Sequence, residues 1–296
     1  MPSFRKAKNQ ARHVLEKSSA IGKPRHQNKS DFYVHSIGTS RNYEQALIRL
    51  GKWMKDHKLG SLHSLTTEDA LRYLNERKDA VKQKTLDQDR QAIQLCLQEK
   101  LPVIKSSVET VLKGRAYTSE QVSLITSAQN PTNALATKIA HTAGLRAHEL
   151  LTLRRIDEGE ASPHRKWVKE RFVAMNGNRY LVTGKGGLTR EVLVAHELST
   201  ELEQCRLPAP VRITDRGVHY ERYYNIAGGH AWSNSFTRAS QRILGWSRGA
   251  HGLRHAYAQE RVDTLQRNGF LYDEALGVVS QELGHFRSDI TEVYLR

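Results

Sequence analysis

One segment of the sequence places an arginine and a glutamate where they could bind an anion together. In HTAGLRAHELLTLRR, residues 141–155, Gly144 predicts the end of one helix and Arg146 the start of the next. The guanidinium of Arg146 and the amides of that helix N-terminus could face the same anion. Glu149 follows three residues later on the same face, where its carboxylate could hold the guanidinium in place. Considered alone, such a pair is more often an ordinary surface ion pair.

Two further segments carry cations at a predicted turn and at a predicted helix start. Lys185 lies between glycines in YLVTGKGGLTREVLV, at the tip of a predicted hairpin, where its ammonium could reach outward and donate a proton. In HGLRHAYAQERV, His251 and Arg254 are three residues apart near a helix start, so both could contact one phosphate. A loop lysine is by itself usually just solvated, so the prediction for Lys185 depends on the other segments.

The last segment pairs a histidine with a tyrosine. In ELGHFRSDITEVYLR, His285 follows a predicted helix stop at Gly284. Tyr294 lies nine residues after His285, on a short predicted helix that begins at Ser288. Considered alone, Tyr294 would be interpreted as a packed aromatic residue.

In this order, the four segments resemble the catalytic domain of the tyrosine recombinase (phage integrase) family. The resemblance spans about residues 118–294. The family signature comprises an arginine in a GLR-x-x-E block, a hairpin lysine, an H-x-L-R-H block and an LGH block shortly before the tyrosine. The sequence fills each of these positions. Residues 40–105 resemble the family's helical core-binding domain in pattern but not in motif.

The resemblance implies a site-specific DNA recombinase, or integrase, of a mobile element or prophage. Such an enzyme cleaves and rejoins DNA strands through a 3′-phosphotyrosyl intermediate. Tyr294 would be the nucleophile, Lys185 would be the general acid that protonates the departing 5′-hydroxyl, and Glu149 matches the acidic position that supports the site. The residues implied to contact the scissile phosphate are Arg146, His251, Arg254 and His285.

These residue types suit phosphoryl transfer without a metal. A free tyrosine has a pKa near 10, so a base and concentrated positive charge must assist its deprotonation, and His251 is the expected base. Two arginines could clamp the equatorial oxygens of the phosphate. We expect neither a cofactor nor a metal, since no Asp/Glu cluster suited to divalent ions is evident. A zinc site at His251 and His255 would lack the intervening glutamate and a third ligand.

Helical periodicity organises the first half of the chain. An apolar stripe over residues 43–54 predicts an amphipathic helix, and a capping signature at Thr66 or Thr67 begins a second. A third helix is predicted through residues 86–97. The predicted organisation is a basic, flexible N-terminal arm at residues 1–30, a helical core-binding domain at 31–105, a linker at 106–117 and a catalytic integrase domain at 118–296.

The second half of the chain mixes helical and strand patterns. Thr118 begins a predicted helix, and strand-like runs follow at residues 171–175, 179–183 and 190–194, separated by turns at NGN and GKGG. Helical patterns return at 234–244, 255–265 and 272–283. The expected fold class is mainly α with a small antiparallel β-sheet (α+β), in which a helical core-binding domain precedes a tyrosine-recombinase catalytic domain. Residues 159–170 and 208–229 look like insertions.

Composition indicates a polyanionic partner. The chain has 296 residues with 46 Lys and Arg against 31 Asp and Glu, a formal net charge of +15 and a sequence pI near 9.9. Nucleic acid is the leading candidate, but charge alone discriminates weakly, because anionic membranes and acidic proteins also attract basic surfaces. The two cysteines, Cys96 and Cys205, show no metal or redox spacing. The sequence shows no signal peptide and no run of about 18 apolar residues, which predicts a cytoplasmic protein. The family resemblance implies that the protein is bacterial and associated with the nucleoid.

The expected partners are double-stranded DNA attachment sites. Since one active site cuts one strand and recombination needs four cuts, a homotetramer on DNA is expected, with accessory DNA-bending or excision factors as further partners. Many relatives carry a tail helix that docks on a neighbouring subunit, whereas this sequence stops two residues after Tyr294. Two alternatives stay open: a type IB topoisomerase-like nicking and closing enzyme, and a DNA-binding accessory factor that does not cleave.

Overall fold

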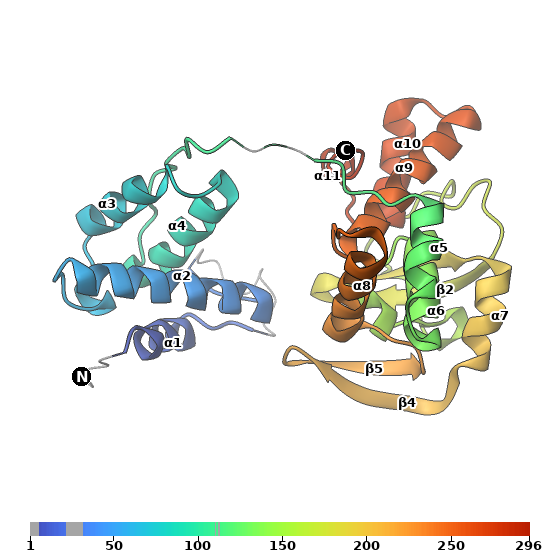
Figure 1. Ribbon diagram of the computed structural model, residues 1–296, viewed down its shortest axis with the longest axis horizontal. Helices are drawn as coiled ribbons and strands as arrows, with labels where there is room; N and C mark the ends of the chain where they lie inside the picture. The colour runs from blue at the N-terminus through green and yellow to red at the C-terminus, as the bar shows by residue number, and fades with distance from the viewer. Residues whose placement is uncertain (1–5, 22–31, 110, 112) are drawn as a thin grey trace. The chain divides into compact units, whose positions relative to one another are not determined.

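The computed structural model describes residues 6–21, 32–109, 111 and 113–296 (Figure 1). The chain divides into two compact units, Met1–Val111 and Leu112–Arg296, which are described separately. This division falls within the predicted linker, residues 106–117. In the described part of the chain, no helix combines the length and the apolar composition needed to cross a bilayer.

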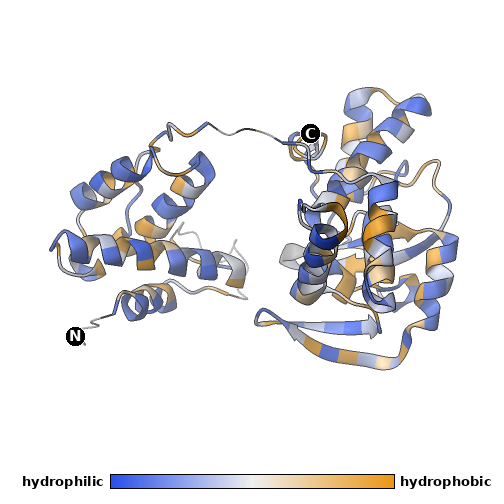
Figure 2. Cartoon of the chain, viewed as in Figure 1, coloured by the Kyte–Doolittle hydropathy of each residue, from blue (hydrophilic) through white to orange (hydrophobic). Residues whose placement is uncertain are grey.

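The first unit is helical. Its elements are α1 (Ala7–Lys17), α2 (Ile37–Asp56), the 3-10 helix η2 (Leu62–Ser64), α3 (Thr67–Arg77) and α4 (Gln83–Leu97). The predicted capping signature is confirmed, because the Thr66 hydroxyl accepts a hydrogen bond from the Asp69 amide at the start of α3. Hydrophilic and hydrophobic residues share each helix (Figure 2), so the apolar faces can turn inward.

A buried carboxylate joins three helices of the first unit. Asp89 of α4 is fully buried and accepts hydrogen bonds from Arg49 of α2, at 2.7 Å, and from Arg77 of α3, at 2.8 Å. The apolar core of the first unit is built from the same helices and includes Leu47, Leu50 and Leu74. Two opposite charges satisfy the carboxylate in the interior, where an unpaired charge would be strongly destabilising.

The predicted flexible arm is partly wrong. Residues 1–5 and 22–30 of it lie outside the described residues, but α1 covers Ala7–Lys17 and packs on the first unit. Ala11, Val14 and Leu15 of α1 are buried against the core, and the Gln10 side chain accepts a hydrogen bond from the Leu62 amide. These apolar residues lie at helical spacing, which is a sequence signal for an amphipathic helix. The prediction of a flexible arm rested on the many basic residues and did not use this signal.

The second unit combines helices with a small sheet and a separate hairpin. Its elements are α5 (Ser119–Ser127), α6 (Pro131–Thr142), η3 (Glu149–Leu151), β1 (Arg154–Arg155), η4 (Ile156–Glu158), β2 (Asn178–Thr183), η5 (Lys185–Gly187), β3 (Thr189–Val194), α7 (His196–Gln204), β4 (Arg206–Asp215), β5 (Val218–Tyr224), α8 (Gly229–Leu244), α9 (His251–Arg267), α10 (Tyr272–Glu282) and α11 (Ser288–Glu292). Thr118 forms the predicted capping box with Gln121 at the start of α5.

The three-stranded antiparallel sheet has the order β1-β2-β3, and its register pairs Leu181 with Glu191 and Thr183 with Thr189. The predicted strand at residues 171–175 is wrong, because this segment forms turns in which Phe172 and Ala174 have positive φ values of 68° and 59°. The Phe172 amide donates instead to the Glu282 side chain, at 2.8 Å. A tertiary contact therefore replaces the ladder hydrogen bond that a strand would have made.

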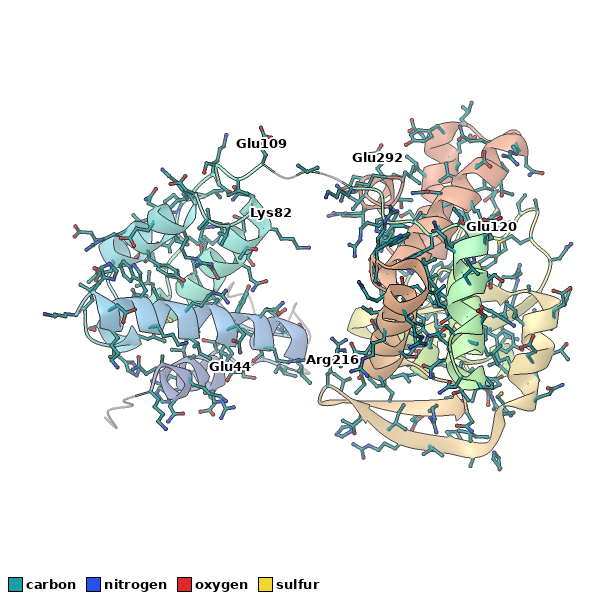
Figure 3. The ribbon with its side chains drawn as sticks, in the orientation of Figure 1. Glu44, Lys82, Glu109, Glu120, Arg216 and Glu292 are labelled. Atoms are coloured by element: carbon teal, nitrogen blue, oxygen red, sulfur yellow. The ribbon has the colours of Figure 1, made fainter. Side chains whose placement is uncertain are left out.

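Residues 208–229, which look like an insertion in the sequence, mostly form the antiparallel hairpin β4–β5. Arg216 lies at the turn of this hairpin (Figure 3). The hairpin is anchored at Asp215, whose carboxylate accepts a hydrogen bond from the His230 amide at 3.0 Å, at the start of α8. On β5, the ring of Tyr220 lies 6.3 Å from that of His148, measured between ring centres. The hairpin thus packs beside η3.

Two apolar clusters hold the rest of the second unit together. One joins α5, α6, the sheet and α8 through residues such as Ile125, Ile139 and Phe236. The other joins α9 and α10 and includes Tyr294. The end of α10 and the segment that follows α11 are therefore fixed against α9.

Candidate active site

Arg146 and Glu149 lie in a tight turn after α6. The predicted α-helix after Gly144 is wrong: a turn leads directly into the short 3-10 helix η3. The Glu149 carboxylate bends back to accept hydrogen bonds from the Arg146 amide and from its Nη1, both at 2.7 Å. Leu150 and Leu151 are buried, so packing takes the chain into the interior instead of along a surface helix. The predicted pairing of the guanidinium with the carboxylate is nevertheless present.

Arg254 crosses the interior from α9 to two other segments. Its side chain is fully buried, and its guanidinium donates to the carbonyl oxygens of Gly144, at 2.5 Å, and Leu283. Burial, followed by repulsion from Arg146, lowers the pKa of Arg254 to about 9. The group still carries its charge at neutral pH, and the carbonyl oxygens fix the direction in which it points.

His285 follows α10, and its imidazole contacts the guanidinium groups of both Arg146 and Arg254. Its Nε2 lies 2.7 Å from Nη2 of Arg146 and 3.1 Å from Nη2 of Arg254. A guanidinium only donates, so Nε2 is the acceptor in both contacts. Burial, together with the nearby charges of Arg254 and Arg146, lowers the pKa of His285 to about 3. The imidazole is therefore neutral at neutral pH.

Tyr294 brings a hydroxyl group to the same place. Its side chain is buried, with 7% of the residue exposed, and its Oη lies 3.4 Å from Nε2 of His285. Its carbonyl oxygen contacts Nδ1 of His255, at 3.2 Å, and accepts from Nε2 of Gln259, at 3.1 Å. His255 and Gln259 of α9 thus hold the backbone of Tyr294 in place.

His251 begins α9 on the exposed side of the site. Its ring centre lies 5.4 Å from that of Tyr294 and 5.7 Å from that of the buried His255. His251 is exposed to solvent. Among the described residues, no group of three or more His, Cys, Asp or Glu side chains could hold a metal ion.

Lys185 begins η5, at the tip of the hairpin that joins β2 to β3, but its side chain lies outside what the structure describes. Gly186 and Gly187 follow with φ values of 79° each, which glycine adopts without strain. The preceding residue, Gly184, lines a pocket of about 150 Å³ together with Arg146. A Cβ atom on Gly184 would lie 3.1 Å from Oε1 of Glu149, so the hairpin backbone passes close to the Arg146 turn.

Glu149 is the anionic centre of the cluster. Burial alone raises its pKa, but Arg190, Arg254 and Arg146 outweigh burial and hold the pKa well below its usual range. Three guanidinium groups surround one carboxylate, which leaves a net positive charge beside Tyr294. Such a site favours an anion.

Arg190 is a residue that the sequence motifs did not indicate. It is 1% exposed, and both of its terminal nitrogens lie 3.1 Å from the Glu149 oxygens. A signal was present in the sequence: the alternation of β3 puts Arg190 on the same face as Val192 and Val194. An arginine on the buried face of a strand needs a partner, and Glu149 supplies it.

Comparisons with known proteins identify the fold. Residues 33–99 match the family described as phage integrase, N-terminal SAM-like domain. The chain is similar to a XerH site-specific recombinase bound to palindromic difH substrate in a post-cleavage complex, with a TM-score of 0.58 and 14% identity over 98% of this chain and 90% of that one. It is also similar to a lambda integrase in a tetramer bound to a Holliday junction, with a TM-score of 0.58 and 14% identity over 97% of this chain and 76% of that one.

A lambda integrase in a dimer bound to a COC′ core site gives a TM-score of 0.57 and 14% identity over the same shares of the two chains, 97% and 76%. No curated protein matches the chain by sequence. The fold expected from the resemblance is thus confirmed: a helical unit followed by a mainly helical unit with a small antiparallel sheet, as in these recombinases.

Proposed function

We propose that the protein is a site-specific DNA recombinase that cleaves and rejoins strands through a 3′-phosphotyrosyl intermediate, with Tyr294 as the nucleophile. The observation that carries this proposal is the position of the Tyr294 hydroxyl, 3.4 Å from the His285 nitrogen on which Arg146 and Arg254 converge. A phosphate placed among these donors would lie beside the hydroxyl. The matches to solved recombinases support the proposal through the fold.

In the proposed reaction, Tyr294 Oη attacks the phosphorus of the scissile phosphate and the bond from phosphorus to the 5′ oxygen breaks. Arg146 and Arg254 stabilise the charge that develops on the nonbridging oxygens, because their guanidinium groups are already held in place by Glu149 and by backbone carbonyls. Lys185 donates a proton to the departing 5′ oxygen, which leaves as a 5′-hydroxyl. The phosphotyrosyl ester retains the bond energy, so a 5′-hydroxyl can reverse the reaction and rejoin a strand.

Two histidines are placed to take the proton from Tyr294. We retain His251 as the proposed base, since its ring lies beside that of Tyr294 and is exposed where substrate would approach. His285 is the alternative base, because its unprotonated Nε2 lies 3.4 Å from the hydroxyl, but Arg146 and Arg254 donate to the same nitrogen. His251→Gln and His285→Gln separate the two: loss of the base should slow adduct formation and make the remaining rate rise steeply with pH.

We further propose that the partners are double-stranded DNA attachment sites and that four copies assemble on two duplexes. The lambda integrase relative forms a tetramer on a Holliday junction, which supports this arrangement. Integration or excision of a mobile element in a bacterial nucleoid, assisted by DNA-bending or excision factors, would suit such an enzyme.

The decisive test is a trapping assay. A nicked suicide substrate carrying candidate attachment-site DNA is incubated with the wild-type protein and with Tyr294→Phe, and the products are separated on a denaturing gel. The wild type should give a covalent adduct, and the variant should give none while it still binds DNA, since only a hydroxyl is lost. Tyr272→Phe is the matched control, because Tyr272 is exposed on α10, and it should form the adduct normally.

Other outcomes favour the alternatives. If the wild-type protein forms no adduct with any of the DNA fragments that it binds, a DNA-binding accessory factor that does not cleave would be favoured. Relaxation of supercoiled DNA through the Tyr294 adduct, without exchange between two sites, would favour a topoisomerase-like nicking and closing enzyme.

A further inference from the structure

Arg190 connects the segments that carry the candidate site. It lies on β3, five residues after Lys185, and its nitrogens Nη1 and Nη2 each lie 3.1 Å from a different oxygen of Glu149. Its Nε donates to the backbone carbonyl of Glu282, at the end of α10, at 2.8 Å. One side chain therefore joins the β2–β3 hairpin, the Arg146 turn and the end of α10.

The turn that presents His285 is built on the Arg190 side chain. Gly284 has a φ of 71°, and a Cβ atom there would lie 3.1 Å from Cδ of Arg190. Glu282, whose carbonyl accepts from Arg190, precedes His285 by three residues. Displacing the guanidinium would remove the hydrogen bond that links this turn, through the Glu282 carbonyl, to β3.

The contacts of Arg190 are with Glu149 and the α10 terminus, whereas the guanidinium groups of Arg146 and Arg254 approach His285 directly. Glu149 in turn holds the amide and the guanidinium of Arg146. A change at Arg190 would therefore reach the reacting atoms through Glu149 and through the turn before His285.

We propose that Arg190 is a positioning residue, which holds the Glu149 carboxylate and the His285 turn so that Arg146 and His285 meet at the phosphate. The proposal assumes the recombinase chemistry proposed above. In Arg190→Met, the stem of the side chain is retained but the bidentate contact is lost. Arg190→Lys keeps one charge without the fork that matches both carboxylate oxygens.

The first measurement does not require catalysis. The carboxyl ¹³C signal of Glu149, identified by its loss in Glu149→Gln, is followed against pH in the full-length protein. The charged and titratable groups facing Glu149 are Arg146, His148, Arg190, Arg254 and His285. Glu149 should stay ionised at mildly acidic pH in the wild type, protonate at a clearly higher pH in Arg190→Met, and behave between the two in Arg190→Lys. An unchanged Glu149 titration in Arg190→Met would overturn the proposal.

The second measurement is the single-turnover rate of adduct formation at saturating DNA. Arg190→Met should slow this rate by about 100-fold with little change in DNA affinity, because a displacement of the catalytic groups by about 1 Å lowers the rate by about that factor. Arg190→Lys should restore part of the rate. Arg171→Met is the control, because Arg171 is also a buried arginine paired with a glutamate, Glu191, in the same unit, and it should keep the wild-type rate.

These readouts distinguish the two proposals. A wild-type protein without any adduct refutes the proposed chemistry, while the Glu149 titration still decides whether Arg190 holds the carboxylate. A wild-type adduct that forms equally fast in Arg190→Met refutes the positioning role.

Discussion

At the scale of single residues, burial decides which protonation state each group can hold. Arg254 is fully buried yet remains charged, because carbonyl oxygens and the nearby Glu149 compensate for the lost hydration. The imidazole of His285 is kept neutral by burial and by the two arginines. A site assembled in this way has its donors oriented before any substrate arrives, which is the condition for strong electrostatic stabilisation of a transition state.

The buried His255 should make stability depend on pH. Its pKa is lowered from 6.5 to about 4, first by burial and then by the charge of Arg115. As the pH falls from 6.5 towards 4, the unfolded chain takes up a proton that the folded protein does not, so the free energy of unfolding decreases. His255→Asn removes this titration and can still donate to the Tyr294 carbonyl.

The measurement is thermal unfolding at about pH 7.5 and about pH 5, on either side of the ordinary histidine pKa. His255→Asn should lose less stability on acidification than the wild type. His164→Asn, at an exposed histidine, serves as the control and should follow the wild type. Identical acid sensitivity in His255→Asn and the wild type would show that His255 does not stay neutral in the folded protein.

At the scale of elements, short segments take their structure from the groups against which they pack. The segment after Gly144 would suit an α-helix, but it forms only a 3-10 turn, η3, whose Leu150 and Leu151 are buried in the interior. In α1, basic residues cover one side, while Ala11, Val14 and Leu15 bury the other against the first unit.

Helix α1 should therefore contribute to the stability of the first unit. Leu15→Ala should lower the free energy of unfolding of the first unit by about 2 kcal/mol or more, because the substitution leaves a cavity where the buried leucine side chain packed. Lys8→Ala, on the exposed side of the same helix, should be nearly neutral. Chemical denaturation of the full chain measures both, and an unaffected Leu15→Ala would indicate that residues 7–17 behave as the flexible arm expected from composition.

At the scale of the whole molecule, the net charge of +15 should dominate the affinity for DNA. Each phosphate contact releases condensed counterions, so the logarithm of the binding constant falls linearly with the logarithm of salt concentration. Even two such contacts would weaken binding about tenfold between roughly 50 mM and 200 mM salt. Fluorescence anisotropy with a labelled duplex measures this slope, and an affinity that held constant over that range would contradict a phosphate-dominated interface.

Features that depend on neighbouring residues could be predicted from the sequence. Helix starts at Thr66 and Thr118, the β2–β3 hairpin with its glycine turn and the pairing of Arg146 with Glu149 all follow from interactions over a few residues. Periodicity and turn chemistry act over such short distances, so they can be predicted from short stretches of sequence. The family resemblance added the fold and the order of the site segments.

Tertiary packing determines which of these segments meet and how. Arg146 contacts His285, which is 139 residues away, and Arg190 contacts Glu149, which is 41 residues away. The turn at Phe172 replaced a predicted strand because its amide bonds to Glu282, 110 residues later. Such contacts depend on packing between distant segments and on the need to pair every buried charge, and no local pattern encodes which partner will be available.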